Sequence, residues 1–140
     1  MSRLLSPSRP GAAAWAALLL AALGVAVAGY DHARLFHRGY AEAGIVGPLF
    51  WLNGIATAVV LLFLVFGRVR LFVLGTLLIC VPSIVSILLS HSAVGFFGFR
   101  EGIYDADGTI ILAAEVVATL LVLAALAFGA TRATRHEVAA

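Results

Sequence analysis

The stretch GYDHARLFHRGY, residues 29–40, gathers side chains that could do chemistry at the end of the first apolar run. One Asp, two His and two Arg lie between Asp31 and Arg38. An imidazole can exchange a proton near neutral pH or bind a metal ion, and a nearby carboxylate can support either task. The stretch therefore indicates a ligand site, a proton-handling site or the polar edge of a membrane span. Its Tyr and Arg residues favour the polar edge, and only His32 is expected to reach into a site.

Glu115 is the most informative single residue, because it lies inside the last apolar run. A carboxylate in hydrocarbon costs at least a few kcal/mol, so Glu115 must be protonated, be paired or face water. One interpretation is a proton or ligand site. The other is a structural anchor that bonds to Asn53, a Ser or a His and only fixes the register of the helices.

Catalytic and metal-binding motifs are weak in this sequence. His32 and His37 are five residues apart, whereas one metal ion on a regular helix prefers ligands four apart. A metal or haem site of His32, His91 and Glu115 is a minor alternative, so we predict no metal site, and the sequence identifies no cofactor. An enzyme with Glu115 as acid or base is the weakest of three functional hypotheses. Cys80 is the single cysteine, which excludes an intramolecular disulfide and a dithiol redox pair.

The composition points to the bilayer as the solvent. Of the 140 residues, 63% are hydrophobic and 11% are charged, whereas a soluble domain carries about a quarter charged residues. The net charge of +2 is too small to suggest a nucleic-acid partner. We therefore expect a multi-pass protein of the cell membrane whose main partner is lipid.

Four apolar runs are long enough to cross a bilayer as helices, which takes about 20 residues each. The predicted spans are 11–30, 45–66, 71–90 and 109–129. Together they predict a single all-α domain over residues 1–140, a four-helix transmembrane bundle with antiparallel up-down topology.

The arginines predict the orientation of this bundle, because cytoplasmic segments carry more basic residues. Six would lie on one side: Arg3, Arg9, Arg68, Arg70, Arg132 and Arg135. Three would lie on the other: Arg34, Arg38 and Arg100. Both termini are therefore predicted to be cytoplasmic. The alternative is a signal peptide cleaved after Ala28, which would leave three spans.

The predicted spans place their polar side chains in the outer half of the membrane, at 1.5 Å of depth per helical residue. Pro82 should kink the third span near mid-membrane and widen the bundle just below these polar side chains. We predict a pocket that opens outward and is closed on the cytoplasmic side. The candidate ligand-binding residues are His32, Asn53, Ser86, Ser90, His91, Arg100 and Glu115.

The outer loop GFFGFREGIYDADG, residues 95–108, is predicted to cover this pocket. Its aromatic residues suit the headgroup zone. Arg100 and Glu101 are adjacent and would diverge on a helix, so Arg100 is expected to pair with Asp31, or with Glu115 if the loop folds inward, and to make the loop a lid. The alternative is a loop whose charges are only solvated.

Two motifs resemble small four-span membrane proteins of actinobacteria. One runs from His32 and the pair Gly39-Tyr40 through GIVGPLFWLN, which ends at Asn53, and the other is GFFGFREG at 95–102. The resemblance implies a four-span fold and a membrane location, and it implies no reaction. It draws attention to the matching positions Gly47, Pro48, Asn53, Arg100 and Glu101.

The leading functional hypothesis is a non-enzymatic membrane protein that binds a small hydrophobic or amphipathic ligand, such as a lipid or a quinone. The nearly equal alternative is an accessory or assembly subunit of a larger envelope or respiratory complex, with a membrane-protein partner or a second copy of the chain. Pairs of small residues, Gly24 with Ala28 and Ala125 with Gly129, allow close helix contacts and fit either hypothesis.

Overall fold

The computed structural model describes the backbone of residues 10–102 and 105–138, and the side chains in these ranges as far as Phe128. Four α-helices form the fold: α1 (Ala12–His37), α2 (Val46–Val65), α3 (Val69–Ser90) and α4 (Ala106–Val138). A single 3-10 turn, η2 (Tyr40–Glu42), follows α1. Each long helix is apolar enough, over a sufficient length, to cross a membrane. The predicted all-α, four-helix fold is confirmed.

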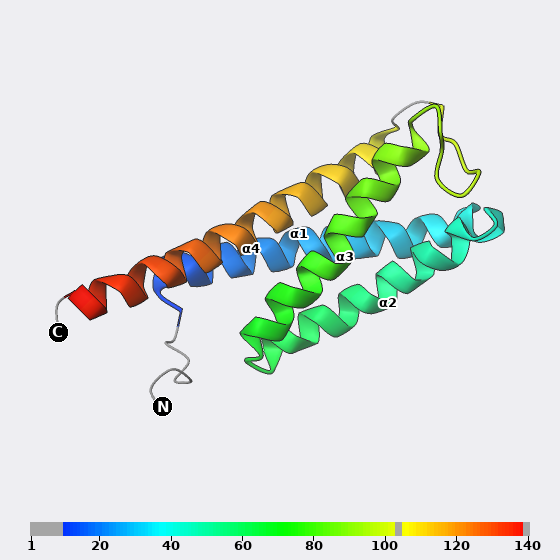
Figure 1. The fold of residues 1–140 in the computed structure, drawn as a ribbon. Helices are drawn as coiled ribbons and strands as arrows, with labels where there is room; N and C mark the ends of the chain where they lie inside the picture. The colour runs from blue at the N-terminus through cyan, green and yellow to red at the C-terminus, as the bar shows by residue number, and fades with distance from the viewer. Residues whose placement is uncertain (1–9, 103–104, 139–140) are drawn as a thin grey trace.

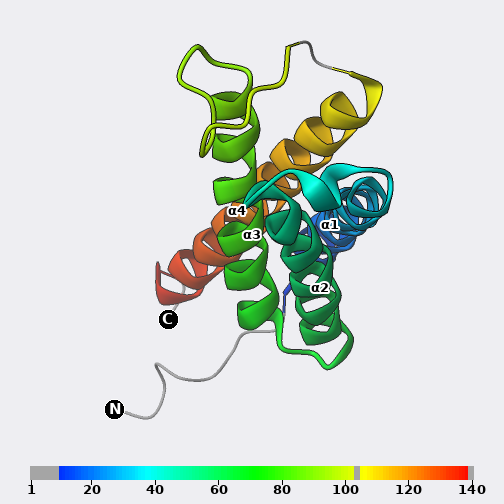
Figure 2. The same ribbon diagram turned by 90° about the vertical axis from the view of Figure 1, so that its right-hand side faces the viewer.

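The helices are arranged so that each one runs opposite to the next along the chain (Figure 1). α1 packs against α4 and α2, and α3 packs against the same two helices. α1 and α3 are therefore diagonal to each other, and Figure 2 shows α1 nearly end-on beside α2. We call the end that carries η2 and the α3–α4 loop the loop end, and the opposite end, with the α2–α3 turn, the terminal end.

α1 is longer than the sequence predicted, because the polar stretch after Tyr30 stays helical as far as His37. Asp31 and Arg34 lie one turn apart on this extension and form an ion pair of 3.0 Å, which is favourable spacing on a helix. Gly39, with φ of 130°, then turns the chain out of the helix. Asp31 is 7% exposed, so it is packed inside the bundle and is not a solvated membrane edge.

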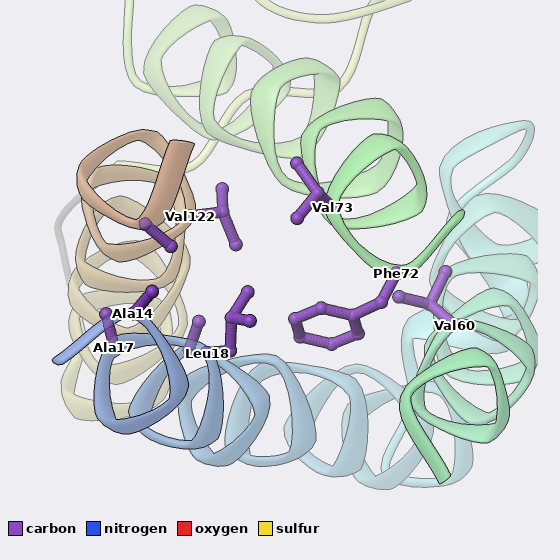
Figure 3. Packing of buried hydrophobic residues seen from close by; sticks show 9 residues of the cluster. Ala14, Ala17, Leu18, Val60, Phe72, Val73 and Val122 are labelled. Atoms are coloured by element: carbon purple, nitrogen blue, oxygen red, sulfur yellow. The ribbon is translucent and has the colours of Figure 1, made fainter. Parts of the chain in front are cut away.

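The terminal half of the bundle is an apolar core. Phe72 of α3 is fully buried and lies beside Leu18 of α1 and Val122 of α4 (Figure 3). Small residues bring α1 close to α4, since a Cβ added at Gly24 would lie 2.9 Å from the carbonyl oxygen of Ala114. Close packing with few polar groups, such as the buried hydroxyl of Thr76, suits a membrane interior. It also leaves the polar chemistry to the loop end.

Two sets of residues named from the sequence lie outside this description. Arg3 and Arg9 precede the described residues, and the side chains of Arg132 and Arg135 follow them. Tyr104 of the outer loop and the surroundings of Gly129 are also outside the described parts.

Candidate functional site

A cavity of about 360 Å³ lies at the loop end, mainly between the first half of α2 and the second half of α3. Its volume falls within the usual range of small-molecule sites. Most of its wall is apolar, with Phe50, Leu52 and Ala56 from α2 and Leu78 and Ile87 from α3. His32 is the one lining residue from α1, and the loop after α3 adds Phe96, Phe99 and Glu101. The cavity is thus apolar along its length and polar on a few sides.

The roof of the cavity is the loop after α3, held down by Tyr40. The ring of Tyr40 stacks on Phe50 at 4.8 Å and touches Phe99 at 5.9 Å. The Tyr40 hydroxyl donates a hydrogen bond to the Glu101 carboxylate. Burial, reinforced by this hydrogen bond, raises the pKa of Tyr40, so its hydroxyl keeps its proton at neutral pH. The Nε2 atom of His91 lies 3.7 Å from the other oxygen of Glu101.

The backbone of the roof depends on the glycines of GFFG. Phe96 and Phe99 exchange two backbone hydrogen bonds of 2.9 Å around a tight turn. Gly95 has φ of 74°, and a Cβ there would lie 2.8 Å from the carbonyl oxygen of Phe99. A side chain at Gly95 would therefore force this turn, and the rings of Phe96 and Phe99 with it, out of place.

The polar wall of the cavity begins at His32, which is 4% exposed. Its Nδ1 atom lies 2.8 Å from the carbonyl oxygen of Ala28, so Nδ1 carries a proton and donates it. In the neutral ring, Nε2 is then an acceptor, and the Ser83 hydroxyl lies 3.3 Å from it. The His32 ring also packs on Phe50, with ring centres 5.0 Å apart. These contacts fix the imidazole in one orientation at the edge of the cavity.

Glu115 lies behind this wall and does not line the cavity. It is 1% exposed, and its carboxyl group is a hydrogen-bond partner of the Ser83 side chain. Its Oε2 atom is buried and has no hydrogen-bond partner among the described residues. Glu115 is therefore paired through Ser83 rather than exposed to water or directly bonded to Asn53.

The other polar lining residues differ in what they can offer. Asn53 accepts a hydrogen bond from Thr57 at 3.5 Å, which leaves its amide N–H groups for the cavity. Ser86 donates to the Pro82 carbonyl at 2.7 Å, and Ser90 donates to the Ile87 carbonyl at 2.8 Å. Both serine protons are thus used by α3 itself. Asn53, His32 and Ser83 remain the groups best able to meet a polar ligand atom.

The predicted pairing of Arg100 with Asp31 is wrong. Asp31 pairs with Arg34 at 3.0 Å, and Arg34 also bonds to Asp107 in the first turn of α4. The extension of α1 explains the difference, because it places Arg34 one turn from Asp31. Arg100 is exposed and lies outside the cavity. Glu101, its neighbour, joins this loop to η2 through its hydrogen bond with Tyr40.

Four of the seven candidate residues line the cavity: His32, Asn53, Ser86 and Ser90. His91, Arg100 and Glu115 do not. The Nδ1 atom of His91 lies 2.9 Å from the Ile87 carbonyl oxygen of its own helix. In the described parts of the chain, no three His, Cys, Asp or Glu side chains lie close enough to hold a metal ion, so His32, His91 and Glu115 do not form such a group.

Ser83 and the aromatic residues of the wall were absent from the predicted site. Ser83 lies one turn before Ser86, so its position on the same face of α3 was a usable signal. Phe50 and Phe99 gave no such signal, since an aromatic residue in an apolar run is ordinarily packing.

Comparisons of the chain with protein-family models, with curated proteins and with solved structures found no match.

Proposed function

We propose that this integral membrane protein binds one small amphipathic molecule, lipid-like or quinone-like, in the cavity at the loop end. The observation that carries the proposal is the shape and chemistry of that cavity. Its 360 Å³ are bounded by apolar side chains, while His32, Asn53 and Ser83 form a polar patch on its wall. A molecule with an apolar body and a compact polar head matches this distribution.

The rim of the cavity supports access from the bilayer. Leu52 on α2 and Leu78 on α3 both line the cavity, and they are 58% and 74% exposed. On a membrane-spanning helix, an exposed leucine faces lipid. The roof of Phe96, Phe99 and Glu101 covers the loop end instead. An occupant dissolved in the membrane can therefore reach the cavity between α2 and α3.

The polar patch favours a head that carries an acceptor oxygen. The Asn53 amide can donate two N–H groups, because its oxygen already accepts from Thr57. A carbonyl or carboxylate oxygen is the natural partner of such a donor. Quinones, fatty acids and lipid esters all share this chemistry.

The arginine distribution supports an orientation for the site. With six arginines on the side of the termini and three on the side of the loop end, the loop end faces outward across the cell membrane. The cavity then opens to the outer leaflet, and the apolar terminal half closes the bundle toward the cytoplasm.

The test fills the cavity and measures binding in lipid nanodiscs. Ala56 lines the cavity, whereas Ala58 on the same helix is exposed and does not. Native mass spectrometry should find a small molecule retained by the wild-type protein and by Ala58→Leu, and lost from Ala56→Leu. Decanoate and decylbenzoquinone, which join similar tails to a carboxylate and to a carbonyl head, serve as defined probes. At least one should bind about tenfold more weakly to Ala56→Leu, about 1.4 kcal/mol, because the added side chain occupies the space of the ligand.

Two outcomes would contradict the proposal. Equal probe binding by Ala56→Leu and Ala58→Leu would place binding outside the cavity. A retained protein subunit, with no small molecule and no probe binding, would instead support the accessory-subunit hypothesis.

A further inference from the structure

Three helices meet in one line of hydrogen bonds beside the cavity. His32 comes from α1, Ser83 from α3 and Glu115 from α4. Ser83 lies 3.3 Å from His32 Nε2 and is also the partner of the Glu115 carboxyl group. α1 and α3 are diagonal in the bundle, so the contact between His32 and Ser83 crosses its centre. Only His32 and Ser83 line the cavity, and Glu115 lies one hydrogen bond behind them.

The donors and acceptors along this line are determined by the His32 ring. Nδ1 donates to the Ala28 carbonyl, so Nε2 of the neutral ring accepts from the Ser83 hydroxyl. Ser83 has then used its only proton, and it can meet Glu115 only as an acceptor. Glu115 must supply the proton of that bond, which makes it a neutral carboxylic acid. This fits its burial, since an unpaired carboxylate is costly there.

Reversal of the Ser83 hydroxyl gives a second arrangement with the same number of protons. The Glu115 proton has then moved through Ser83 to His32 Nε2, so the imidazolium donates to the Ser83 oxygen and Ser83 donates to the Glu115 carboxylate. The three side chains therefore share one proton that can lie at either end. Such a line is a proton relay when its inner and outer groups are both reachable.

We propose that His32, Ser83 and Glu115 form a proton-exchange site for the occupant of the cavity, and that this occupant is an amphipathic weak acid able to bind as its anion. This inference rests on the proposed ligand-binding function and names the class of head group. The carboxylate oxygen of the ligand lies against the Asn53 amide and the Ser83 hydroxyl. Glu115 acts as the proton store.

The transfer is balanced within these groups. The O–H bond of Ser83 breaks as its proton joins the ligand carboxylate, and the O–H bond of Glu115 breaks as its proton joins the Ser83 oxygen. The ligand becomes a neutral acid, Ser83 is restored, and Glu115 becomes a carboxylate that accepts from Ser83. The reverse sequence releases the ligand as an anion.

The other charged groups near the relay do not replace any of its members. On α3, Cys80 lies near Glu115 and is buried. On α1, Asp31 acts on His32 and is already paired with Arg34. α2 carries no acidic, basic or His residue from Val46 to Val65. Arg34 in turn bonds to Asp107 of α4. Among the described residues, His32 is therefore the one base joined to Glu115 through a single hydroxyl.

Infrared difference spectroscopy in nanodiscs tests the relay. The resting protein should show a carboxylic-acid C=O band that Glu115→Gln removes. Decanoate labelled with ¹³C at its carboxyl carbon should reduce this band as it binds, and a shifted ¹³C carboxylic-acid band should grow in its place. Decan-1-ol, which has a similar tail and cannot accept the proton as a carboxylate does, should bind without loss of the band. Empty nanodiscs measure the probe that is dissolved in lipid.

Ser83→Ala is the decisive variant and Ser86→Ala its matched control. Both serines line the cavity on α3, but the Ser86 hydroxyl bonds only to its own helix. Ser83→Ala should bind decanoate more weakly, and at saturation its Glu115 band should stay, while Ser86→Ala should lose the band on binding as the wild type does. Three results would overturn the relay and leave the proposed function standing. Decanoate could bind without changing the band, Ser83→Ala could lose the band as the wild type does, or the resting protein could show no carboxylic-acid band. Failure of all probes to bind would overturn the proposed function as well.

Discussion

Arg34 is the residue that joins the polar extension of α1 to the start of α4. Its guanidinium bonds to Asp31 on its own helix and to Asp107 on α4. The three side chains are 25%, 9% and 28% exposed, so water screens these ion pairs only in part. Loss of one member of a shielded group costs more than loss of a surface charge, because the remaining charges stay unpaired. Arg100 offers the contrast of an exposed arginine on the same end of the bundle.

Arg34→Ala should therefore lower the free energy of unfolding more than Arg100→Ala does, because it leaves Asp31 and Asp107 without the cation that they share. Arg100→Ala should change the free energy of unfolding by less than about 0.5 kcal/mol. Thermal unfolding in one detergent, followed by circular dichroism, compares the two variants. A larger loss of stability for Arg100→Ala than for Arg34→Ala would instead support the pairing of Arg100 with Asp31 that the sequence suggested.

The error over Arg100 has a physical cause. A sequence shows that Arg100 and Glu101 are adjacent, but it does not show which way each points in a loop held by glycines of positive φ. His32 and Asn53 were predictable because depth along a helix follows from residue number. Ser83 could have been found from its place one turn before Ser86, but its partners on two other helices depend on packing. The position of Glu115 beside Ser83 is likewise a property of packing.

α1 and α2 approach each other closely where Gly29 faces Thr57. A Cβ added at Gly29 would lie 2.4 Å from a methyl carbon of Thr57, which leaves no room for even the smallest side chain. His32 lies almost one turn further along α1, so the helix contact at Gly29 positions the imidazole at the cavity wall. The close contact at Gly29 therefore constrains the positions of both helices, α1 and α2.

Gly29→Ala should push α1 and α2 apart and lower the free energy of unfolding by about 1–3 kcal/mol, as for other overpacked sites. It should also weaken decanoate binding, because His32 moves with α1. Gly102→Ala is the control, since a Cβ there would meet nothing within 4 Å. Thermal unfolding and decanoate titration in nanodiscs measure the two effects. If Gly29→Ala unfolds and binds decanoate as the wild type does, the helices can separate at this contact without loss of stability or binding.

The four helices were predictable because apolar runs of sufficient length leave few alternatives in a bilayer. Their ends were less predictable. Hydropathy ended the first span near Tyr30, yet Asp31 and His32 are buried within α1 because each has a polar partner. A polar residue that is paired can lie inside a bundle, and a count of apolar residues cannot detect the pairing.

At the scale of the molecule, the two ends have different chemistry. The terminal half is close-packed and apolar, and α1 supplies much of it through Leu18, Ala21 and Val25. A chain cleaved after Ala28 would lose all of these contacts.

α4 has 33 residues, which makes about 50 Å of helix. It is therefore longer than the hydrocarbon core of a bilayer, which is about 30 Å thick.

The orientation can be tested with single cysteines. Ala93 and Arg68 are exposed at opposite ends of the bundle, while the native Cys80 is buried. In intact cells, a membrane-impermeant maleimide should label Ala93→Cys and spare Arg68→Cys, because the arginine excess predicts that the α2–α3 turn lies inside. A reporter enzyme that is active only in the cytoplasm should be active when it is fused after Ala140. Labelling of Arg68→Cys instead, with an external C-terminus, would show the reverse orientation.

The α2–α3 turn also bears on how fast an occupant can exchange. At Gly67, whose φ is 69°, the chain reverses, and the Arg68 amide donates to the Phe63 carbonyl at 2.7 Å, so the two helices are tightly joined at the terminal end. The cavity lies at the other end of the same pair. With arms of about 30 Å, a rotation of roughly 8° about the turn parts their free ends by about 4 Å. Under the proposed function, we expect small rotations at this turn to determine how long a ligand stays in the cavity.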